Sequence, residues 1–451
     1  MREEGPEGEE GCAMAAFCAP HIGGIDANRT IKDEIVAAIS RRSVRRRIAV
    51  TDLINPRQKF FERAHPEIQP SPERQQAMLA GAGFHETFGR AVSTEEYVEQ
   101  LVEWQEIVGK IDIFEDAPVE LKTGAAIPTT VFWRPDHVEQ LGMYCTMVDR
   151  PAGHLLYYVR AEYGRQAELA AFDLEFTDPT AIALEMVRRR DLLREALNSG
   201  RPDYLPRCTW YGRGCDFAEV CGCSSAEPLI RAVSPQTVRV AANPALAQRL
   251  LEGLGGQPPA PELSLNDLVF PRKAAFRRAP GAEDEEPDAA QRMVSLQRQG
   301  FDQVLGDAVW YGFPGQVRRL PVVLGPVRAS VLLFKEAPTV LRTSRGQRTM
   351  VERRWLAEVF PHYVDRLGFE CALAGRARGR VIVYYAQVPG DKFMVYDIWF
   401  RDLAAIRTEL ERRLALLQRG APPEELPPCR PAWLARFCAY RDRCGCAEPA
   451  G

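Results

Sequence analysis

Apolar residues along the first half of the chain follow first the spacing of helices and then that of strands, and this order predicts an α/β domain. Apolar residues recur at helical spacing over 30–50 and 72–106, where few helix breakers occur, so we expect helices there. Residues 108–114 are apolar and β-branched, and residues 119–123 resume this character after a Glu-Asp-Ala-Pro turn. These two segments predict a strand hairpin.

Helices and strands continue to alternate beyond the hairpin. Helical spacing returns over 138–148, and strands are predicted at 154–160 and 169–176. A long helix at 181–197 ends at the stop signal 198–200, Asn-Ser-Gly. The order of elements predicts a central mixed sheet flanked by helices.

The chain repeats itself on the scale of a whole domain. Four segments of the first half recur in the same order in the second half, with offsets of 215, 217, 220 and 223 residues. The matched pairs are 51–57 with 266–272, 83–92 with 300–309, 116–123 with 336–343, and 215–223 with 438–446. Four collinear matches indicate a duplication, and the period is far too long for a solenoid. We therefore expect two tandem domains of the same fold.

Length and composition agree with this division. A chain of 451 residues exceeds what one hydrophobic core organises comfortably. We expect an acidic, disordered tail at 1–29, a first domain at 30–230, a linker region at 231–262 and a second domain at 263–448. No segment approaches the ~18 uninterrupted apolar residues of a spanning helix. The acidic start is the reverse of a signal peptide, so we expect a cytoplasmic protein with no membrane partner.

The net charge of −3 limits how the chain could meet nucleic acid, because contact would have to come from local basic patches. The run at 41–47, which contains five arginines, is one candidate. A solvated helix end is an equally good interpretation of the same run.

The predicted hairpin carries a chemically suggestive pattern, Gly109-x-x-Asp112 followed by Glu120-x-Lys122. Side chains alternate along a strand, so Glu120 and Lys122 share a face while Leu121 enters the core. Asp112 on the paired strand can reach that face. Two carboxylates suit a hard cation such as Mg²⁺, which lowers the pKa of a bound water. The lysine could orient that water or stabilise developing negative charge.

Three further residues strengthen a pattern that is weak by itself. His85 lies upstream, where a neutral imidazole could complete a metal shell. Gln140 and Tyr144 are four residues apart on a predicted helix and therefore share one face. Taken singly, they would be a packed helix histidine, a surface glutamine and a core tyrosine. Only the joint pattern favours a site.

Together these motifs resemble the PD-(D/E)XK nuclease superfamily, and in particular its RecB-like branch, which includes CRISPR-associated exonucleases and nuclease domains of recombinational repair. The resemblance covers roughly residues 45–225 and implies a restriction-endonuclease-like fold. It implies that the ligands of Mg²⁺ or Mn²⁺ are His85, Asp112 and Glu120, and that Lys122 is the catalytic lysine. It also implies that Gln140 and Tyr144 support the site or contact DNA.

The second copy has lost this pattern. The positions of His85, Asp112, Glu120 and Lys122 are taken by Asp302, Leu332, Val340 and Arg342, and those of Gln140 and Tyr144 by Arg366 and Glu370. Leucine and valine cannot ligate a metal, so we expect a degenerate domain that does not cut. Its fold could hold DNA, a partner or the first copy, and the fused pair could act as a pseudo-dimer within one chain.

Each copy ends in four clustered cysteines, from a total of 12 in the chain. The first cluster is Cys208, Cys215, Cys221 and Cys223, and the second is Cys429, Cys438, Cys444 and Cys446. Four thiolates suit zinc or an iron–sulfur cluster. The resemblance favours [4Fe–4S], in one or both copies, over Zn²⁺. The family's early cysteine is missing, however, because Asn55 and Phe270 occupy its two positions.

These features predict a metal-dependent DNA nuclease that hydrolyses phosphodiester bonds. The resemblance implies an exonuclease on single-stranded DNA or DNA ends, in repair, recombination or CRISPR-type DNA processing. No Walker-type motif is present, so unwinding would need a partner such as a helicase, and CRISPR adaptation proteins are the other expected partners. The alternatives are an inactive iron–sulfur or zinc scaffold that binds DNA, and an RNase.

Overall fold

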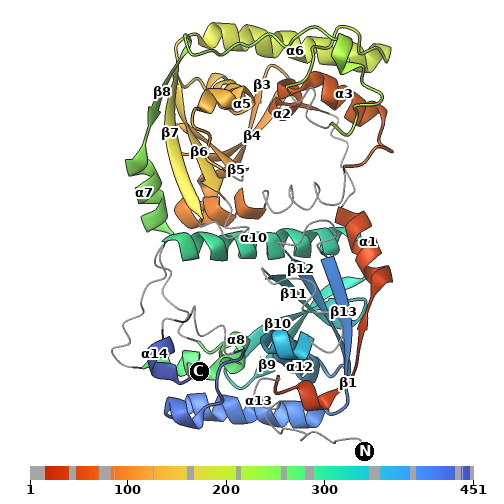
Figure 1. Cartoon of the computed structure of the whole chain (residues 1–451), viewed down its shortest axis with the longest axis vertical. Helices are drawn as coiled ribbons and strands as arrows, with labels where there is room; N and C mark the ends of the chain where they lie inside the picture. The colour runs from red at the N-terminus through yellow and green to blue at the C-terminus, as the bar shows by residue number, and fades with distance from the viewer. Residues whose placement is uncertain are drawn as a thin grey trace, which may run out of the picture. The chain divides into compact units, whose positions relative to one another are not determined.

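The computed structural model describes residues 16–39, 47–70, 83–85, 87–124, 126–159, 167–209, 215–254, 262–279, 289–344, 356–385, 393–431, 438 and 440–446. They form two units, each a mixed β-sheet with helices (Figure 1). The first-sheet unit comprises residues 40–256 and 288–304, and the second-sheet unit comprises residues 1–39, 257–287 and 305–451. Helix α10 (Ala289–Gly312) contributes to both units.

A seven-stranded sheet forms the first-sheet unit, in the order β2-β4-β5-β6-β7-β8 with β3 also paired to β4. Its neighbours are antiparallel except β2–β4 and β5–β6. The strands are β2 (Ile48–Ala49), β3 (Val98–Trp104), β4 (Ile107–Phe114), β5 (Pro118–Gly124), β6 (Ala152–Val159), β7 (Glu168–Phe176) and β8 (Val238–Ala242). The four strands predicted between residues 108 and 176 are therefore confirmed to within about two residues.

Helices cover both faces of this sheet. On one face, α5 (Pro135–Met147) forms the crossover between the parallel strands β5 and β6, as parallel pairing requires. It packs in turn against α6 (Pro179–Ser199), with α2 (Val50–Ile54) and α3 (Pro56–Ala64) beside them. On the other face lie α7 (Pro244–Gly253), which packs on β7, and the helical segment that contains Phe84 and Phe88.

Two of the predicted helices are shorter than the sequence pattern suggested. The helix expected over 30–50 is α1 (Arg29–Ile39), and residues 48–49 form β2. The helix expected over 72–106 gives way to β3, which joins β4 through Gln105 and Glu106, both with positive φ. Such a turn usually carries Asn or Gly, so the Gln-Glu pair gave no hairpin signal. Residues 71–82 and the basic run, apart from Arg47, lie outside the described residues.

The six strands of the second-sheet unit run in the order β1-β13-β12-β11-β10-β9. They are β1 (Ile22–Ala27), β9 (Val317–Leu324), β10 (Val327–Phe334), β11 (Ala337–Ser344), β12 (Arg378–Tyr385) and β13 (Phe393–Phe400). Only β11 and β12 are parallel, and α12 (Pro361–Ala374) joins them. The remaining helices are α1, α8 (Leu265–Val269), α9 (Pro271–Arg278), α11 (Leu356–Val359), α13 (Leu403–Gln418) and α14 (Arg441–Cys444). This topology parallels that of the first sheet.

Each half of the sequence supplies one strand, and the helix that follows it, to the sheet formed by the other half. β1, near the start of the chain, pairs with β13, and β8 pairs with β7. Asn28 donates a hydrogen bond to Asp397 at 2.9 Å, and Asn243 donates one to Asp173, also at 2.9 Å.

These boundaries differ from those predicted from the sequence. Residues 22–39, assigned in part to a disordered tail, form β1 and α1, and residues 238–253, assigned to a linker, form β8 and α7. Residues 1–15 lie outside the described part of the chain.

None of the helices in the described ranges has the length and apolarity needed to cross a membrane.

Candidate functional site

The candidate site lies where β4 and β5 separate. The two strands pair only at Ile113–Val119 and Phe114–Pro118 before they diverge. Just beyond that point the Asp112 carboxylate accepts a hydrogen bond from the backbone N–H of Leu121 at 2.8 Å. The side chain thus satisfies a backbone group that strand pairing no longer reaches. Asp112 is fixed at the fork for this reason.

Glu120 and Lys122 extend from β5 toward α5. The Lys122 ammonium donates to Glu120 Oε1 at 2.5 Å and to Gln140 Oε1 at 2.8 Å. Gln140 in turn donates to the Tyr144 hydroxyl at 3.3 Å. The lysine is therefore held between a carboxylate of its own strand and an amide of the covering helix.

The sixth predicted residue reaches the same place from a different element. His85 belongs to the helical segment before β3, and its Nδ1 lies 3.4 Å from Asp112 Oδ1. The structure therefore brings together all six residues that the sequence singled out around the possible Mg²⁺ or Mn²⁺ site: His85, Asp112, Glu120, Lys122, Gln140 and Tyr144.

The two carboxylates differ in how strongly they hold a proton. Burial raises the pKa of Glu120 to about 7, because the nearby Asp112 charge reinforces the effect and Lys122 only partly opposes it. Burial also acts to raise the pKa of Asp112. The neighbouring His85, the Leu121 N–H and Lys122 outweigh it, so that this pKa falls below its usual value. Near neutral pH the pair therefore carries between one and two negative charges.

A glycine gives Tyr144 its place over the fork. A Cβ atom on Gly109 would lie 2.9 Å from the Tyr144 ring and 3.0 Å from Val102. Tyr144 is buried against this strand, and its hydroxyl faces Gln140. The G-x-x-D pattern therefore has a steric reason: glycine admits the tyrosine, and aspartate marks the fork.

The donor set fits a divalent cation, although it is not preorganised. Among the described residues, no group of three or more His, Cys, Asp or Glu side chains is arranged to hold a metal ion. One oxygen nevertheless lacks any partner: Glu120 Oε2 is buried and accepts no hydrogen bond. Leaving such an atom unsatisfied is unfavourable unless something binds it. The carboxylates of Asp112 and Glu120 and the imidazole of His85 are ligand types that Mg²⁺ or Mn²⁺ accepts.

The equivalent region of the second sheet is chemically different. Glu120 and Lys122 on β5 correspond to Val340 and Arg342 on β11, because β11 pairs with β12 in the same register as β5 pairs with β6. Leu332, at the position of Asp112, lies on β10. Arg366 on α12 donates to Glu370 at 2.6 Å, one turn further along the same helix. Burial raises the pKa of Glu370. The aligned positions on β10 and β11 therefore carry no carboxylate, and the remaining predicted counterpart, Asp302, lies on α10.

Each cysteine group gathers against the helix at the start of its own repeat. The Cys208 N–H donates to the Cys223 sulfur at 3.4 Å, and the Cys429 N–H donates to the Cys446 sulfur at 3.3 Å. Burial raises the pKa of Cys208, and the negative charges of Cys223 and Cys215 add to the effect. All described cysteines are free, namely Cys18, Cys145, Cys208, Cys215, Cys221, Cys223, Cys371, Cys429, Cys438, Cys444 and Cys446.

An arginine fixes each cysteine tail in the same way. Arg57 on α3 donates from Nε to the carbonyl of Cys221 at 2.9 Å, and Arg272 on α9 donates to the carbonyl of Cys444, also at 2.9 Å. Asn55, which precedes α3, accepts from the backbone and hydroxyl of Thr209, next to Cys208. Asn55, which occupies the position where the resemblance implies an early cysteine, therefore lies beside the first cluster.

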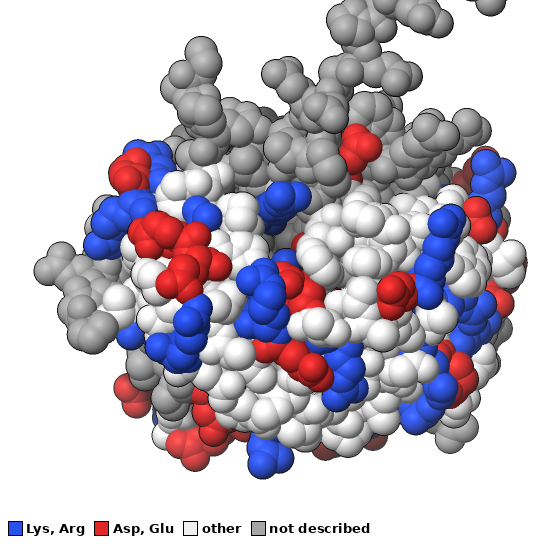
Figure 2. Space-filling model, turned by 90° about the horizontal axis from the view of Figure 1, so that it is seen from below, with Lys and Arg blue, Asp and Glu red and all other residues white. Residues whose placement is uncertain are grey.

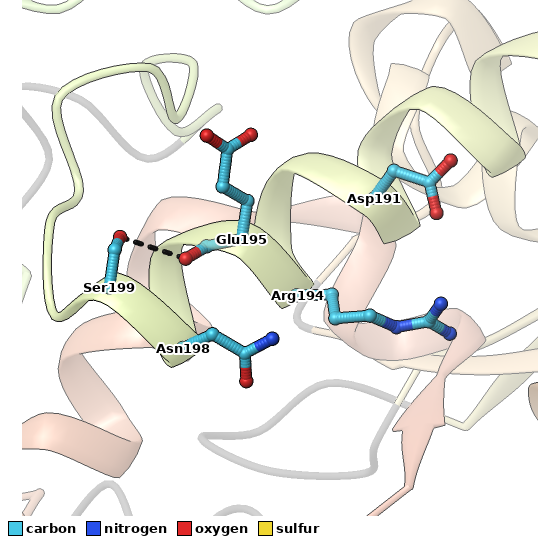
Figure 3. A pocket seen from close by; sticks show the side chains of 5 residues that line it. All are labelled: Asp191, Arg194, Glu195, Asn198 and Ser199. Carbon is cyan, nitrogen blue, oxygen red and sulfur yellow. Dashed lines mark hydrogen bonds between the residues drawn. The ribbon is translucent and has the colours of Figure 1, made fainter.

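A cleft that the sequence did not reveal opens beside Lys122. Its volume is about 500 Å³, and Trp133, Arg134, His137 and Tyr157 line it together with the end of β5. The sequence held one signal for it: His137 lies one turn before Gln140 on α5. A second depression, of about 450 Å³, is lined by residues of α6 alone and brings no groups together from different elements (Figure 3).

Charge is mixed on the face of the molecule that is seen in Figure 2. Figure 2 shows Lys and Arg side chains interspersed with Asp and Glu on the face in view, with no continuous basic area. Along α13, Arg407 pairs with Glu411 and Arg412 with Glu409. Interspersed charges of this kind do not make a strong electrostatic footprint for a polyanion on this face.

Comparisons with known proteins give little further guidance. No family model and no curated protein matches the chain. A solved structure titled "Crystal structure of SSO0001" is 19% identical to the chain, with a TM-score of 0.31, over 43% of this chain and 94% of that one.

Proposed function

We propose that the chain is a metal-dependent nuclease of the PD-(D/E)XK type, whose active site is the fork of β4 and β5. The observation that carries this proposal is the pair of contacts at the fork, His85 with Asp112 and Lys122 with Glu120 Oε1, together with the buried Glu120 Oε2 that has no hydrogen-bond partner. In this role Mg²⁺ or Mn²⁺ would be held by Asp112, Glu120 and His85. The bound cation supplies a water of lowered pKa and neutralises charge on the phosphodiester.

The chain's own residues divide the remaining work. Lys122 offers an ammonium that can hydrogen-bond the attacking water or the phosphate oxygens as negative charge develops there. Gln140 and Tyr144 hold that ammonium in place, because Gln140 Oε1 accepts from it while the amide N–H contacts Tyr144. Glu120 must be deprotonated to serve as a ligand, and its raised pKa makes this step sensitive to pH near neutrality.

We further propose that the chain is a tandem duplication in which the second sheet is an inactive copy. Matching contacts support this beyond the sequence repeat. Arg189 on α6 donates to the Leu53 carbonyl, and Arg413 on α13 donates to the Leu268 carbonyl. Each cysteine tail would hold a structural [4Fe–4S] cluster, with zinc as the alternative. DNA would be the substrate, and a helicase or CRISPR adaptation proteins would be the partners.

The experiment is a cleavage assay on single- and double-stranded DNA labelled at either end, with Mg²⁺, Mn²⁺ or a chelator, using protein purified without oxygen. We expect cutting that needs the metal and is lost in Asp112→Asn and Glu120→Gln while the fold is retained. A folded, metal-supplied wild type that binds DNA and never cuts it would instead support an inactive DNA-binding scaffold.

A further inference from the structure

The cleft beside Lys122 presents an unusually exposed aromatic side chain. Trp133 has 67% of its surface exposed, whereas the Tyr157 side chain deeper in the cleft is buried. Exposing an indole to water is unfavourable, because its large apolar surface forgoes the gain from burial. The indole therefore offers a free π-face next to the proposed active site.

Local structure fixes Trp133 where it is. It ends the short 3-10 helix η4 (Val131–Trp133), where Thr130 caps the turn by accepting from the Phe132 N–H. The Trp133 N–H donates to the Thr130 carbonyl at 3.1 Å. Pro135 begins α5 two residues later. The backbone that carries the indole is therefore held by local hydrogen bonds before any partner binds.

Two cations stand at the rim of the cleft, and its floor is uncharged. Lys122 and Arg134 keep 17% and 38% of their side chains exposed, and Arg134 is held by Asp136 at 2.9 Å. His137 contacts the Tyr157 hydroxyl at 3.0 Å. Burial, with the positive charges of Lys122 and Arg134, lowers the pKa of His137 to about 3, so this imidazole is neutral at ordinary pH.

The second sheet provides an internal comparison. Its helix α12 begins at Pro361 as α5 begins at Pro135, and the two residues before Pro361 are Val359 and Phe360. Phe360 is buried in the core at 2% exposure. The exposed indole and the arginine therefore occur beside the sheet that keeps the carboxylate pair; beside the other sheet, a partly buried valine takes the place of Trp133 and the buried Phe360 takes that of Arg134.

We propose that this cleft binds an unpaired nucleobase, stacked on Trp133, with the adjoining phosphate at Lys122 and Arg134. The inference rests on the proposed nuclease function and assigns a residue that selects single-stranded nucleic acid. Every base has a π-face, so stacking on an aromatic ring tolerates any sequence. A base within a duplex is stacked and paired on all sides and cannot offer that face without unpairing. The cations supply the phosphate contact that stacking lacks.

The test measures binding without cleavage, by fluorescence anisotropy of full-length protein in a chelator. The probes are labelled oligothymidylate, the matching blunt duplex, and unlabelled thymidine monophosphate as competitor. Trp133→Ala should weaken oligothymidylate binding about tenfold, Trp133→Phe should restore most of it, and duplex binding should not change. Trp399→Ala, which removes a 36% exposed tryptophan from β13, is the matched control and should bind like wild type.

Three results would overturn the proposal: unchanged oligothymidylate affinity in a folded Trp133→Ala protein, an equal loss for oligothymidylate and duplex, or the same loss in Trp399→Ala. Competition by the monophosphate alone at equal affinity would show a nucleotide site instead of a strand site, and would also overturn it. Because no metal is present, failure of the nuclease assay leaves this measurement intact. A cutting enzyme whose binding ignores Trp133 would fail only the cleft proposal.

Discussion

At the fork of β4 and β5, two neighbouring carboxylates respond to burial in opposite ways. Asp112 has a histidine, a backbone N–H and a lysine within reach, and its pKa falls. Glu120 shares the same lysine but leaves one oxygen without a partner, and its pKa rises to about 7. The site is therefore short of positive charge at the glutamate, which is where a cation would contribute most.

The raised pKa of Glu120 predicts how stability varies with pH in the absence of metal. The folded site keeps this proton up to about pH 7, whereas the unfolded chain releases it near 4.5. The contribution is therefore full below about pH 4.5 and lost as pH rises toward 7, an effect on the order of 3 kcal/mol. Asp112, with a lowered pKa, acts only below this window.

Denaturant unfolding between pH 5 and pH 8, in a chelator, checks this expectation. Glu120→Gln should show a flatter pH dependence of the free energy of unfolding than wild type. Equal slopes for the two proteins would mean that Glu120 does not hold its proton as described.

The positions of Gln140 and Arg366 predict opposite consequences for two equivalent substitutions. Gln140→Ala frees Lys122 from one of its two partners, so we expect about tenfold less cutting with little change in stability. Arg366→Ala strips the buried Glu370 of its pair and should cost about 2–3 kcal/mol of stability without affecting cutting. Cleavage rates and unfolding curves of both variants make the comparison. Loss of cutting in Arg366→Ala at a temperature where it is folded would contradict it.

Among the elements, β4 has a sequence requirement that links it to the covering helix. The residue at the position of Gly109 in the second repeat is Ala329 on β10, where Glu370 replaces Tyr144 on the covering helix. Gly109→Ala would push a methyl group against the Tyr144 ring, and this ring can yield only by leaving Gln140. We expect a stability loss of about 1–3 kcal/mol and reduced cutting, measured by thermal unfolding and nuclease assay. Wild-type activity in this variant would show that Tyr144 has no positioning role.

Elements with a strong period were predictable from the sequence, and those defined by distant partners were not. Apolar runs in the sequence predict the strands β4, β5, β6 and β7. β3 does not, because its turn to β4 uses Gln105 and Glu106 in place of the usual Asn or Gly. β1 and β8 are short and polar on one side, and their strand character depends on partners that are not adjacent in sequence, β13 for β1 and β7 for β8.

The residues of the candidate site also divide into those that the sequence predicted and those that it did not. His85, Asp112, Glu120, Lys122, Gln140 and Tyr144 could be predicted because their spacing follows from strand and helix geometry and from the family resemblance. Trp133 and Arg134 could not, since the value of an exposed tryptophan before a proline depends on the cleft beside it, and the sequence does not show that cleft.

On the scale of the whole molecule, each half of the sequence contributes a strand and a helix to the other half's sheet. β1 and α1 belong to the second-sheet unit, and β8 and α7 to the first-sheet unit. The asparagine after each strand bonds to an aspartate of the receiving sheet, Asp397 or Asp173. A cut between the repeats would therefore remove an edge strand from both sheets.

This exchange predicts that removing residues 1–39 harms the sheet that is distant in sequence. The deletion strips β1 from β13 and should expose the second-sheet unit to proteolysis, while the first-sheet unit stays folded and cuts DNA. Limited proteolysis with fragment identification, together with a cleavage assay, tests both parts. Protection of residues 305–451 in the truncated protein would show that β1 is dispensable there.

The most direct test of one active and one inactive site compares Lys122→Ala with Arg342→Ala, the same position on β5 and β11. Both proteins are purified without oxygen and assayed on labelled single-stranded DNA with Mn²⁺. The account predicts that Lys122→Ala loses cutting by about 100-fold or more while Arg342→Ala stays near wild type. Equal activity of the two variants, whether both retained or both lost, would contradict it.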